Sequence, residues 1–282
     1  MAWDKINRRV FVGLQTGLIK QYQTDSDYNK ISVLDDIRVH TGRVSALFYD
    51  SRRNFLVIVL LILFSYEKLS VSRDETIVLY SVDSRRELSS LKPMISSLMS
   101  LAIDVELQRG FIGSSSGKIL IVDFSKTTIR FLYAIDAHAS VVRSLYFERT
   151  NGYLFTGTFE QICSIWKVGN PGEESVSTKK VGVLRGGPSF NIKSVLFIPS
   201  RKAVVTGHES GYLAFWHTRD GNLINVVKVH DQAIVGLSWE DSSAELMTIS
   251  RDGSVSIWSL TGREVSFRPH VKDDMYARIM KS

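Results

Sequence analysis

The residues of this sequence that could do catalytic or metal-binding chemistry are few and widely spaced. The six histidines are spread between His40 and His270, and Cys163 is the single cysteine. A structural zinc site usually draws on several cysteines, and covalent catalysis needs a nucleophile, a base and an orienting group. Neither combination occurs here at a recognised spacing, and Gly186-Gly187 in LRGGPS matches no phosphate-binding loop. We therefore expect no enzymatic activity, no metal and no cofactor.

A recurring spacing gives most of these polar residues a structural interpretation. Short apolar runs end at residues 22, 80, 122, 166, 216 and 258, and an Asp, Glu, Ser or Thr lies six positions before each end. Five of the ends follow an earlier apolar run, namely VSALFYD, LMSLAID, VRSLYFE, KSVLFIP and VGLSWED. A period in the low forties with short β-branched and aromatic strands and tight turns is typical of a β-propeller of WD-repeat type. We predict an all-β fold, with a propeller of six recognisable repeats over 1–267 and a tail over 268–282.

At these positions the chain resembles the WD-repeat family. In that family a His before the first strand, a Ser or Thr on the second, a turn Asp and a third-strand Trp form a buried hydrogen-bonded set. The resemblance implies that set at His40, Asp74 and Tyr80, at His138, Glu160 and Trp166, at Trp216, and at His230, Asp252 and Trp258. A buried carboxylate or imidazole needs such partners, so we interpret these residues as structural. The other copies lack the histidine and must hold their turns differently.

The second copy carries a dozen extra residues, 58–69, with the sequence IVLLILFSYEKL. Deleting them leaves FLVSVSRDETIVLYS, which matches LMTISRDGSVSIWS of the last copy. The segment is too apolar for an ordinary surface loop and is about half the length that spans a bilayer as a helix. Three explanations stay open: an exposed interaction finger, a segment packed over its sheet, and an artefact of the gene structure.

The first copy retains only the end of its first strand, Ala2-Trp3-Asp4. Because open sheet edges are a liability, a propeller joins its first and last blades. The sequence fits a six-bladed ring closed imperfectly or a seven-bladed one truncated at the N-terminus, and we favour the second. The tail, 268–282, would supply a strand, form a short helix or stay loose.

Several phrases, in order along the chain, resemble one subfamily, the WD-repeat and FYVE-domain endosomal proteins. They are RRVFVGLQTG (8–17), DYNK (27–30), VHTGRVSALF (39–48) and ELQRGFIGSSSGKILIVDF (106–124). That subfamily also carries a cysteine-rich, zinc-binding FYVE finger, which a chain with one cysteine cannot contain. Phosphoinositide binding by that finger is therefore not carried over, and a propeller scaffold of endosomal traffic or signalling remains as the implication.

Composition narrows the function classes further. The chain is 44% hydrophobic and 23% charged, which excludes a disordered chain and an integral membrane protein as first interpretations. The net charge of +6 comes without a polybasic cluster, so we expect no nucleic-acid binding.

We predict a monomeric, non-enzymatic scaffold for other proteins or acidic peptides, cytoplasmic or peripheral to endosomes. The candidate contact residues are the first-strand cations Arg43, Arg143 and Lys193. The alternative is a phosphoinositide- or membrane-surface-binding propeller.

Overall fold

Short antiparallel strands and tight turns alternate along the chain. The computed structural model describes residues 2–4, 7–25, 31–38, 43–50, 52–53, 55–61, 75–169, 178–184, 187–259 and 269–270. Apart from one 3-10 turn, η1 (Pro199–Arg201), the regular elements of these residues are β-strands, so the all-β prediction is confirmed. The chain divides into two compact units, Met1–Val142 and Arg143–Ser282, which are described separately.

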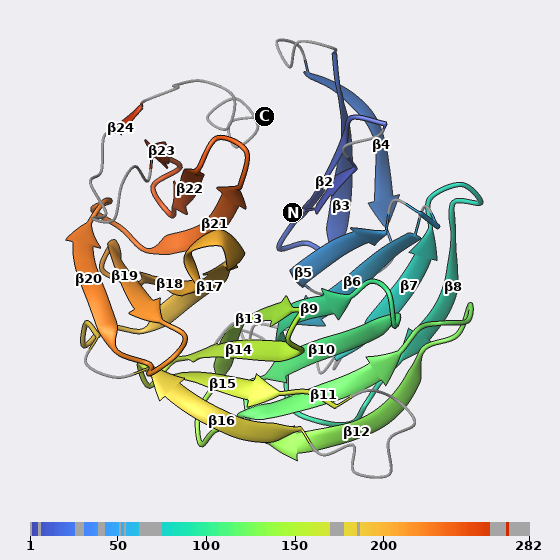
Figure 1. Cartoon of the computed structure of the whole chain (residues 1–282). Coiled ribbons are helices and arrows are strands. Elements are labelled where there is room, and N and C mark those ends of the chain that lie inside the picture. The colour runs from blue at the N-terminus through green and yellow to red at the C-terminus, as the bar shows by residue number, and fades with distance from the viewer. Residues whose placement is uncertain are drawn as a thin grey trace, which may run out of the picture. The chain divides into compact units, whose positions relative to one another are not determined.

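The first unit holds three four-stranded antiparallel sheets, each a propeller blade whose strands follow chain order (Figure 1). The first comprises β1 (Ala2–Asp4), β2 (Arg9–Gly13), β3 (Leu18–Thr24) and β4 (Ile31–Arg38). The second comprises β5 (Arg43–Asp50), β6 (Phe55–Leu61), β7 (Ile77–Ser81) and β8 (Arg86–Leu91). The third comprises β9 (Leu98–Asp104), β10 (Arg109–Ser114), β11 (Lys118–Asp123) and β12 (Arg130–Asp136).

The second unit repeats this arrangement. Its first sheet comprises β13 (Val142–Glu148), which begins on the last residue of the first unit, β14 (Tyr153–Thr158), β15 (Cys163–Lys167) and β16 (Lys179–Leu184). The next comprises β17 (Ile192–Ile198), β18 (Ala203–His208), β19 (Tyr212–His217) and β20 (Leu223–Lys228). The last comprises β21 (Ile234–Glu240), β22 (Glu245–Ser250), β23 (Val255–Ser259) and β24 (Pro269–His270).

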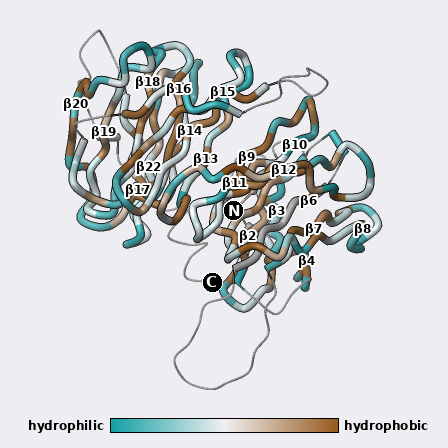
Figure 2. The backbone as a smooth tube through the Cα atoms, turned by 90° about the horizontal axis from the view of Figure 1, so that it is seen from below, coloured by the Kyte–Doolittle hydropathy of each residue, from teal (hydrophilic) through white to brown (hydrophobic). Residues whose placement is uncertain are grey.

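Burial follows strand position within a sheet. In β9 buried and half-buried residues alternate, as expected for a strand whose two faces meet different surroundings. The central strand β10 is buried throughout, whereas the outer strand β12 is mostly exposed or half-buried. Figure 2 shows apolar residues along the strands and hydrophilic residues at the turns that join them.

Apolar side chains between neighbouring sheets form the core. In the first unit Phe11 is fully buried and stacks on Tyr49 of the next sheet at a ring-centroid distance of 5.2 Å. In the second unit Phe155 stacks on Phe197 of the next sheet at 5.3 Å. Sheet-to-sheet packing of this kind means that each blade depends on its neighbour, as in other repeat folds.

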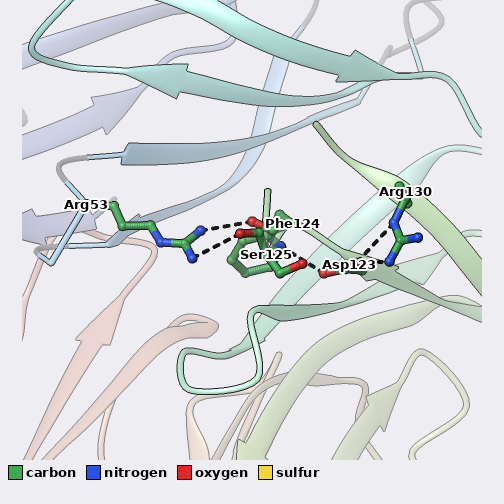
Figure 3. Close-up of polar contacts among 5 residues, drawn as sticks. All are labelled: Arg53, Asp123, Phe124, Ser125 and Arg130. Atoms are coloured by element: carbon green, nitrogen blue, oxygen red, sulfur yellow. Dashed lines mark hydrogen bonds and ion pairs between the residues drawn. The ribbon is translucent and has the colours of Figure 1, made fainter. Parts of the chain in front are cut away.

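A polar link also joins two blades of the first unit. Arg53, in the turn before β6, donates through Nη1 to the carbonyl oxygen of Phe124 at 3.1 Å and through Nη2 to that of Ser125 at 3.1 Å (Figure 3). Asp123, next to them, accepts from the guanidinium of Arg130 and from the backbone N–H of Ser125 (2.8 Å). The forked guanidinium thus fixes the residues after β11 against the neighbouring sheet.

The structure describes parts of the three segments that depart from the repeat, namely 58–69, 2–4 and 268–282. The strand β6 runs through residues 58–61, so the first part of the extra segment forms the second strand, paired with β5 and β7, and residues 62–69 lie outside the described residues. Ala2–Asp4 forms β1, paired with β2. From the tail, Pro269–His270 forms the short strand β24 on β23, and its remaining residues lie outside the description.

Candidate functional site

Three third-strand tryptophans share one buried hydrogen-bond pattern. Each indole Nε1–H donates to the hydroxyl of a fully buried threonine on the second strand, ten residues earlier in the chain. The pairs are Trp166 with Thr156 (3.2 Å), Trp216 with Thr206 (3.0 Å) and Trp258 with Thr248 (3.0 Å). An indole N–H is a donor only, so the threonine oxygen satisfies it inside the sheet.

In the last sheet the predicted histidine joins this pattern. His230 Nε2 lies 2.7 Å from Thr248 Oγ1, and His230 Nδ1 lies 3.0 Å from Ser254 Oγ. Thr248 also donates to the carbonyl oxygen of Ser256 (3.3 Å), so its single proton is used there. The histidine must then donate from Nε2 and accept at Nδ1. This assignment satisfies every polar atom of the set with a neutral imidazole.

The fifth copy lacks a histidine before its first strand, and a histidine on the second strand takes the role. His208 Nδ1 lies 2.9 Å from the carbonyl oxygen of Phe190, and Nε2 lies 2.8 Å from Thr206 Oγ1. Because a carbonyl oxygen only accepts, Nδ1 carries the proton and Thr206 donates to Nε2. The two histidines therefore hold opposite tautomers. The sequence signal for this role was the spacing Thr206-x-His208 on a buried strand.

Burial lowers the pKa of both imidazoles. His208 is 1% exposed, and desolvation there outweighs the opposing effect of the Phe190 carbonyl, which accepts from the ring. For His230 desolvation outweighs the fields of Asp252 and Asp231, which favour the charged form. Both rings are therefore neutral structural groups at neutral pH.

The turn acids differ from the expected buried carboxylates. Asp252 is exposed, and the pKa of its carboxyl is lowered chiefly by the side chain of Ser254 and further by the backbone N–H of Ser254, which donates to Oδ1 at 2.8 Å. Asp252 therefore has no direct contact with His230 in this set. Ser254 lies between them, and the negative charge of Asp252 favours the charged imidazole. Glu160 is likewise exposed, in the turn before β15. In the turn of Glu160 the hydroxyl of Thr158 accepts from the backbone N–H of Ile162 at 3.2 Å, so a hydroxyl takes a position that the resemblance assigned to the acid.

The remaining residues of the expected set have mixed outcomes. Tyr80 lies buried in β7, where desolvation raises the pKa of its hydroxyl. His138 is half-buried in the first unit, and its backbone N–H donates to the carbonyl oxygen of Gly117 at 3.0 Å. His40 and Asp74 lie outside the described residues.

Two of the three candidate contact cations occupy equivalent positions in the second unit. In four sheets the first strand has a β-bulge near its start, where one residue has no partner on the second strand. The bulged residues are Ser45, Met99, Lys193 and Val235. Arg143 has the place of Lys193 in its own strand, since the preceding Val142 and Ile192 each pack closely on a glycine of a second strand. A bulge re-aims the side chain that it carries. Arg43 begins β5 in the first unit and is half-buried.

Lys193 belongs to a compact charged cluster rather than standing alone. Its Nζ lies 2.9 Å from Glu209 Oε1 and 5.5 Å from the ring centroid of Phe159. Asn191 Nδ2 donates to Glu209 Oε2 at 2.5 Å. The hydrogen bond from Lys193 lowers the pKa of Glu209, and the field of Arg143 adds to this effect. We call Arg143, Phe159, Asn191, Lys193 and Glu209 the Lys193 cluster.

The Lys193 cluster combines charge with accessible apolar surface. The Lys193 side chain is 16% exposed and that of Glu209 42%, while Phe159 is 44% exposed. Lys193 contacts the Glu209 carboxylate beside the exposed Phe159 ring, and the positive field of Arg143 also acts on that carboxylate. Such a surface suits a partner that brings carboxylates of its own.

Other chemistry-bearing groups have structural positions. Cys163 is fully buried in β15, where desolvation raises the pKa of its thiol to about 12. Within the described ranges no three His, Cys, Asp or Glu residues gather closely enough to hold a metal ion. The described residues also include no helix long and apolar enough to cross a membrane.

Comparison with known proteins agrees with the blade geometry. The family described as WD domain, G-beta repeat matches residues 221–259, which cover β20 to β23. The chain is 22% identical over 218 residues to WD repeat and FYVE domain-containing protein 1 of Mus musculus, covering 77% of this chain and 48% of that protein. It is 25% identical over 170 residues to WD repeat and FYVE domain-containing protein 2 of Mus musculus, covering 60% and 39%. The chain thus spans half or less of the length of these curated relatives.

Proposed function

We propose, from the premise that this chain carries a WD repeat and is homologous to the WD repeat and FYVE domain-containing proteins, that it is a non-enzymatic scaffold for other proteins. WD-repeat propellers generally bind other proteins, and the site has to be argued from surface residues. The observation that carries the proposal is the Lys193 cluster. There Lys193 lies beside an exposed aromatic ring and a carboxylate, and the field of Arg143, at the equivalent strand position, acts on the same carboxylate.

The partner class follows from the chemistry of that cluster. Lys193 already forms an ion pair with Glu209 at 2.9 Å, so its ammonium group is placed to bind a carboxylate. An acidic peptide would add carboxylates to Arg143 and Lys193 or displace Glu209, and Phe159 would cover its aliphatic stem. Because Glu209 competes with the peptide for Lys193, the free energy of peptide binding depends on the negative charge of Glu209.

A titration with labelled peptide tests this site. The probe is a fluorescein-labelled oligo-Glu peptide, followed by fluorescence anisotropy, with an oligo-Lys peptide as the reverse probe. Arg143→Glu with Lys193→Glu is expected to weaken oligo-Glu binding by about tenfold or more, and Glu209→Gln to tighten it. Lys228→Glu, on the exposed end of β20, is the matched control for an added acid on the second unit. Equal affinities for wild type and the double variant would refute the site.

The proposed setting is the cytoplasm or the endosome surface, with the chain as a monomer. The relatives' names, WD repeat and FYVE domain-containing proteins, support only the endosomal part of this setting. Imaging of a tagged chain against an endosome marker tests the setting. Co-sedimentation with phosphoinositide vesicles tests the alternative of direct membrane binding, and co-sedimentation that requires the phosphoinositide and weakens with salt would favour that alternative.

A further inference from the structure

A notch in the second unit lies between the outer strand β16 and the turn 218–221 that follows β19. It is a cavity of about 240 Å³ floored by Tyr153, Phe155 and Ile165. The turn lies close against β16, because a side chain at Gly221 would come within 2.8 Å of the carbonyl oxygen of Val183. The notch is therefore a built feature of two neighbouring blades, with apolar side chains at its base.

The space of the notch lies over Gly182, which has no side chain and stands beside two apolar residues on neighbouring strands. Phe155, Ile165 and Gly182 pair in register across β14, β15 and β16, so they lie on one face of the sheet. Phe155 is covered by Phe197, but at Gly182 nothing continues the row. A methyl group at Gly182 would meet Ile165 first, at ordinary contact distances of 3.6–3.8 Å. The free volume at this position is available to an apolar side chain from outside.

The rim of the notch adds exposed apolar surface and positive charge. Val181 lines it and is 55% exposed. Lys167 and Lys179 pair in register with Tyr153, so their side chains leave the same face of the sheet, and Lys167 Nζ lies 5.2 Å from the Tyr153 ring centroid. The exposed Arg219 lines the notch as well.

Among the described residues at this rim, Asp220 is the acid that opposes these three cations. Asp220 accepts from the backbone N–H of Asn222 at 3.0 Å, and this contact lowers the pKa of the carboxyl. The notch is thus an apolar hollow of side-chain size, and the charges of its described rim residues sum to a positive value, which is complementary to an apolar residue flanked by acids.

We propose that this notch binds an acidic linear peptide of a partner protein, whose single large aliphatic side chain fills the space at Gly182. The flanking acids of the peptide pair with Lys167, Lys179 and Arg219. The site uses none of the residues of the Lys193 cluster, so each proposal can fail while the other stands. It would give the scaffold a second contact whose specificity depends on an apolar anchor and not only on charge.

The test measures how much binding depends on the anchor. The probes are two fluorescein-labelled peptides of Asp and Glu residues that differ only at the centre, where one carries Leu and the other Ser. In the wild type we expect the Leu peptide to bind about tenfold tighter than the Ser peptide, from burial of the aliphatic side chain. Gly182→Val fills the notch and is expected to bring this ratio near one. The Lys179→Glu and Arg219→Glu double variant should weaken both peptides.

Controls separate the notch from the other site and from misfolding. Lys228→Glu is the charge control, and the near-ultraviolet circular dichroism of the tryptophans reports whether Gly182→Val has folded. The Arg143→Glu and Lys193→Glu variant should still prefer the Leu peptide by at least the wild-type ratio, since it removes the charge-driven binding that both acidic peptides share at the Lys193 cluster. An equal affinity of the two peptides for wild type, or an unchanged ratio in a folded Gly182→Val variant, would overturn the proposal. So would a dimer that Gly182→Val dissolves, because the occupant would then be a second copy.

Discussion

The buried hydroxyl of Thr206 is a single atom on which two other side chains depend. Its Oγ1 accepts from Trp216 Nε1–H at 3.0 Å and donates to His208 Nε2 at 2.8 Å. Thr206→Val keeps the branched shape and replaces the hydroxyl with a methyl group. The indole N–H and the imidazole nitrogen, both on side chains that are at most 3% exposed, would then lose their partners. Each orphaned buried group costs about 1–3 kcal/mol, so with two such groups we expect a loss of about 2–6 kcal/mol in the free energy of unfolding.

Urea unfolding followed by tryptophan fluorescence measures this loss, with linear extrapolation to water. Thr218→Val is the matched control, since the Thr218 hydroxyl donates to the carbonyl oxygen of Lys202 at an exposed site. We expect the control to lose less than about 1 kcal/mol, because water can satisfy the carbonyl that it leaves. Equal losses in the two variants, or a Thr206→Val variant as stable as wild type, would refute the assignment of Thr206 as the shared partner.

Three further predictions follow from other described contacts. Burial holds the pKa of His208 below its ordinary value of 6.5. As the pH falls below about 6.5, this imidazole is therefore protonated in the unfolded state before it is protonated in the folded state. The free energy of unfolding should therefore fall in that range, and His208→Gln should flatten the dependence measured by urea unfolding at several pH values. Arg53→Met removes both donors to the carbonyls of Phe124 and Ser125 and should lower the free energy of unfolding by about 1–3 kcal/mol, with no such loss for Lys126→Met. Cys163, buried with its thiol pKa raised to about 12, should react with a thiol reagent only as fast as the chain unfolds, and rapid labelling of the native chain would contradict its placement.

Sequence reasoning located the strands well because their ends follow a fixed spacing. All six predicted end positions lie on third strands, from Tyr22 in β3 to Trp258 in β23. The alternation of apolar runs and turn residues carries that information locally. The histidine network of the last sheet could be anticipated too, since His230 and Trp258 stand at the positions that the family resemblance implies.

Contacts set by packing between segments could not be read from the sequence. The role of His208 depends on the folded sheet, which brings the carbonyl oxygen of Phe190, eighteen residues earlier, to its Nδ1. The ion pair of Lys193 also joins separate segments, because Glu209, in the turn after β18, lies 2.9 Å from it. The notch at Gly182 depends on a missing side chain in a cross-strand row, which requires the register of three strands.

Affinity capture from native lysate tests the scaffold proposal most directly. The bait proteins are wild type, the Arg143→Glu and Lys193→Glu variant and the Lys228→Glu control, with bound proteins quantified by mass spectrometry. The account predicts a set of proteins enriched by wild type and by the control and depleted by the double variant, with acidic segments over-represented among them. Identical sets for all three baits, or no enrichment by wild type over an empty matrix, would contradict it.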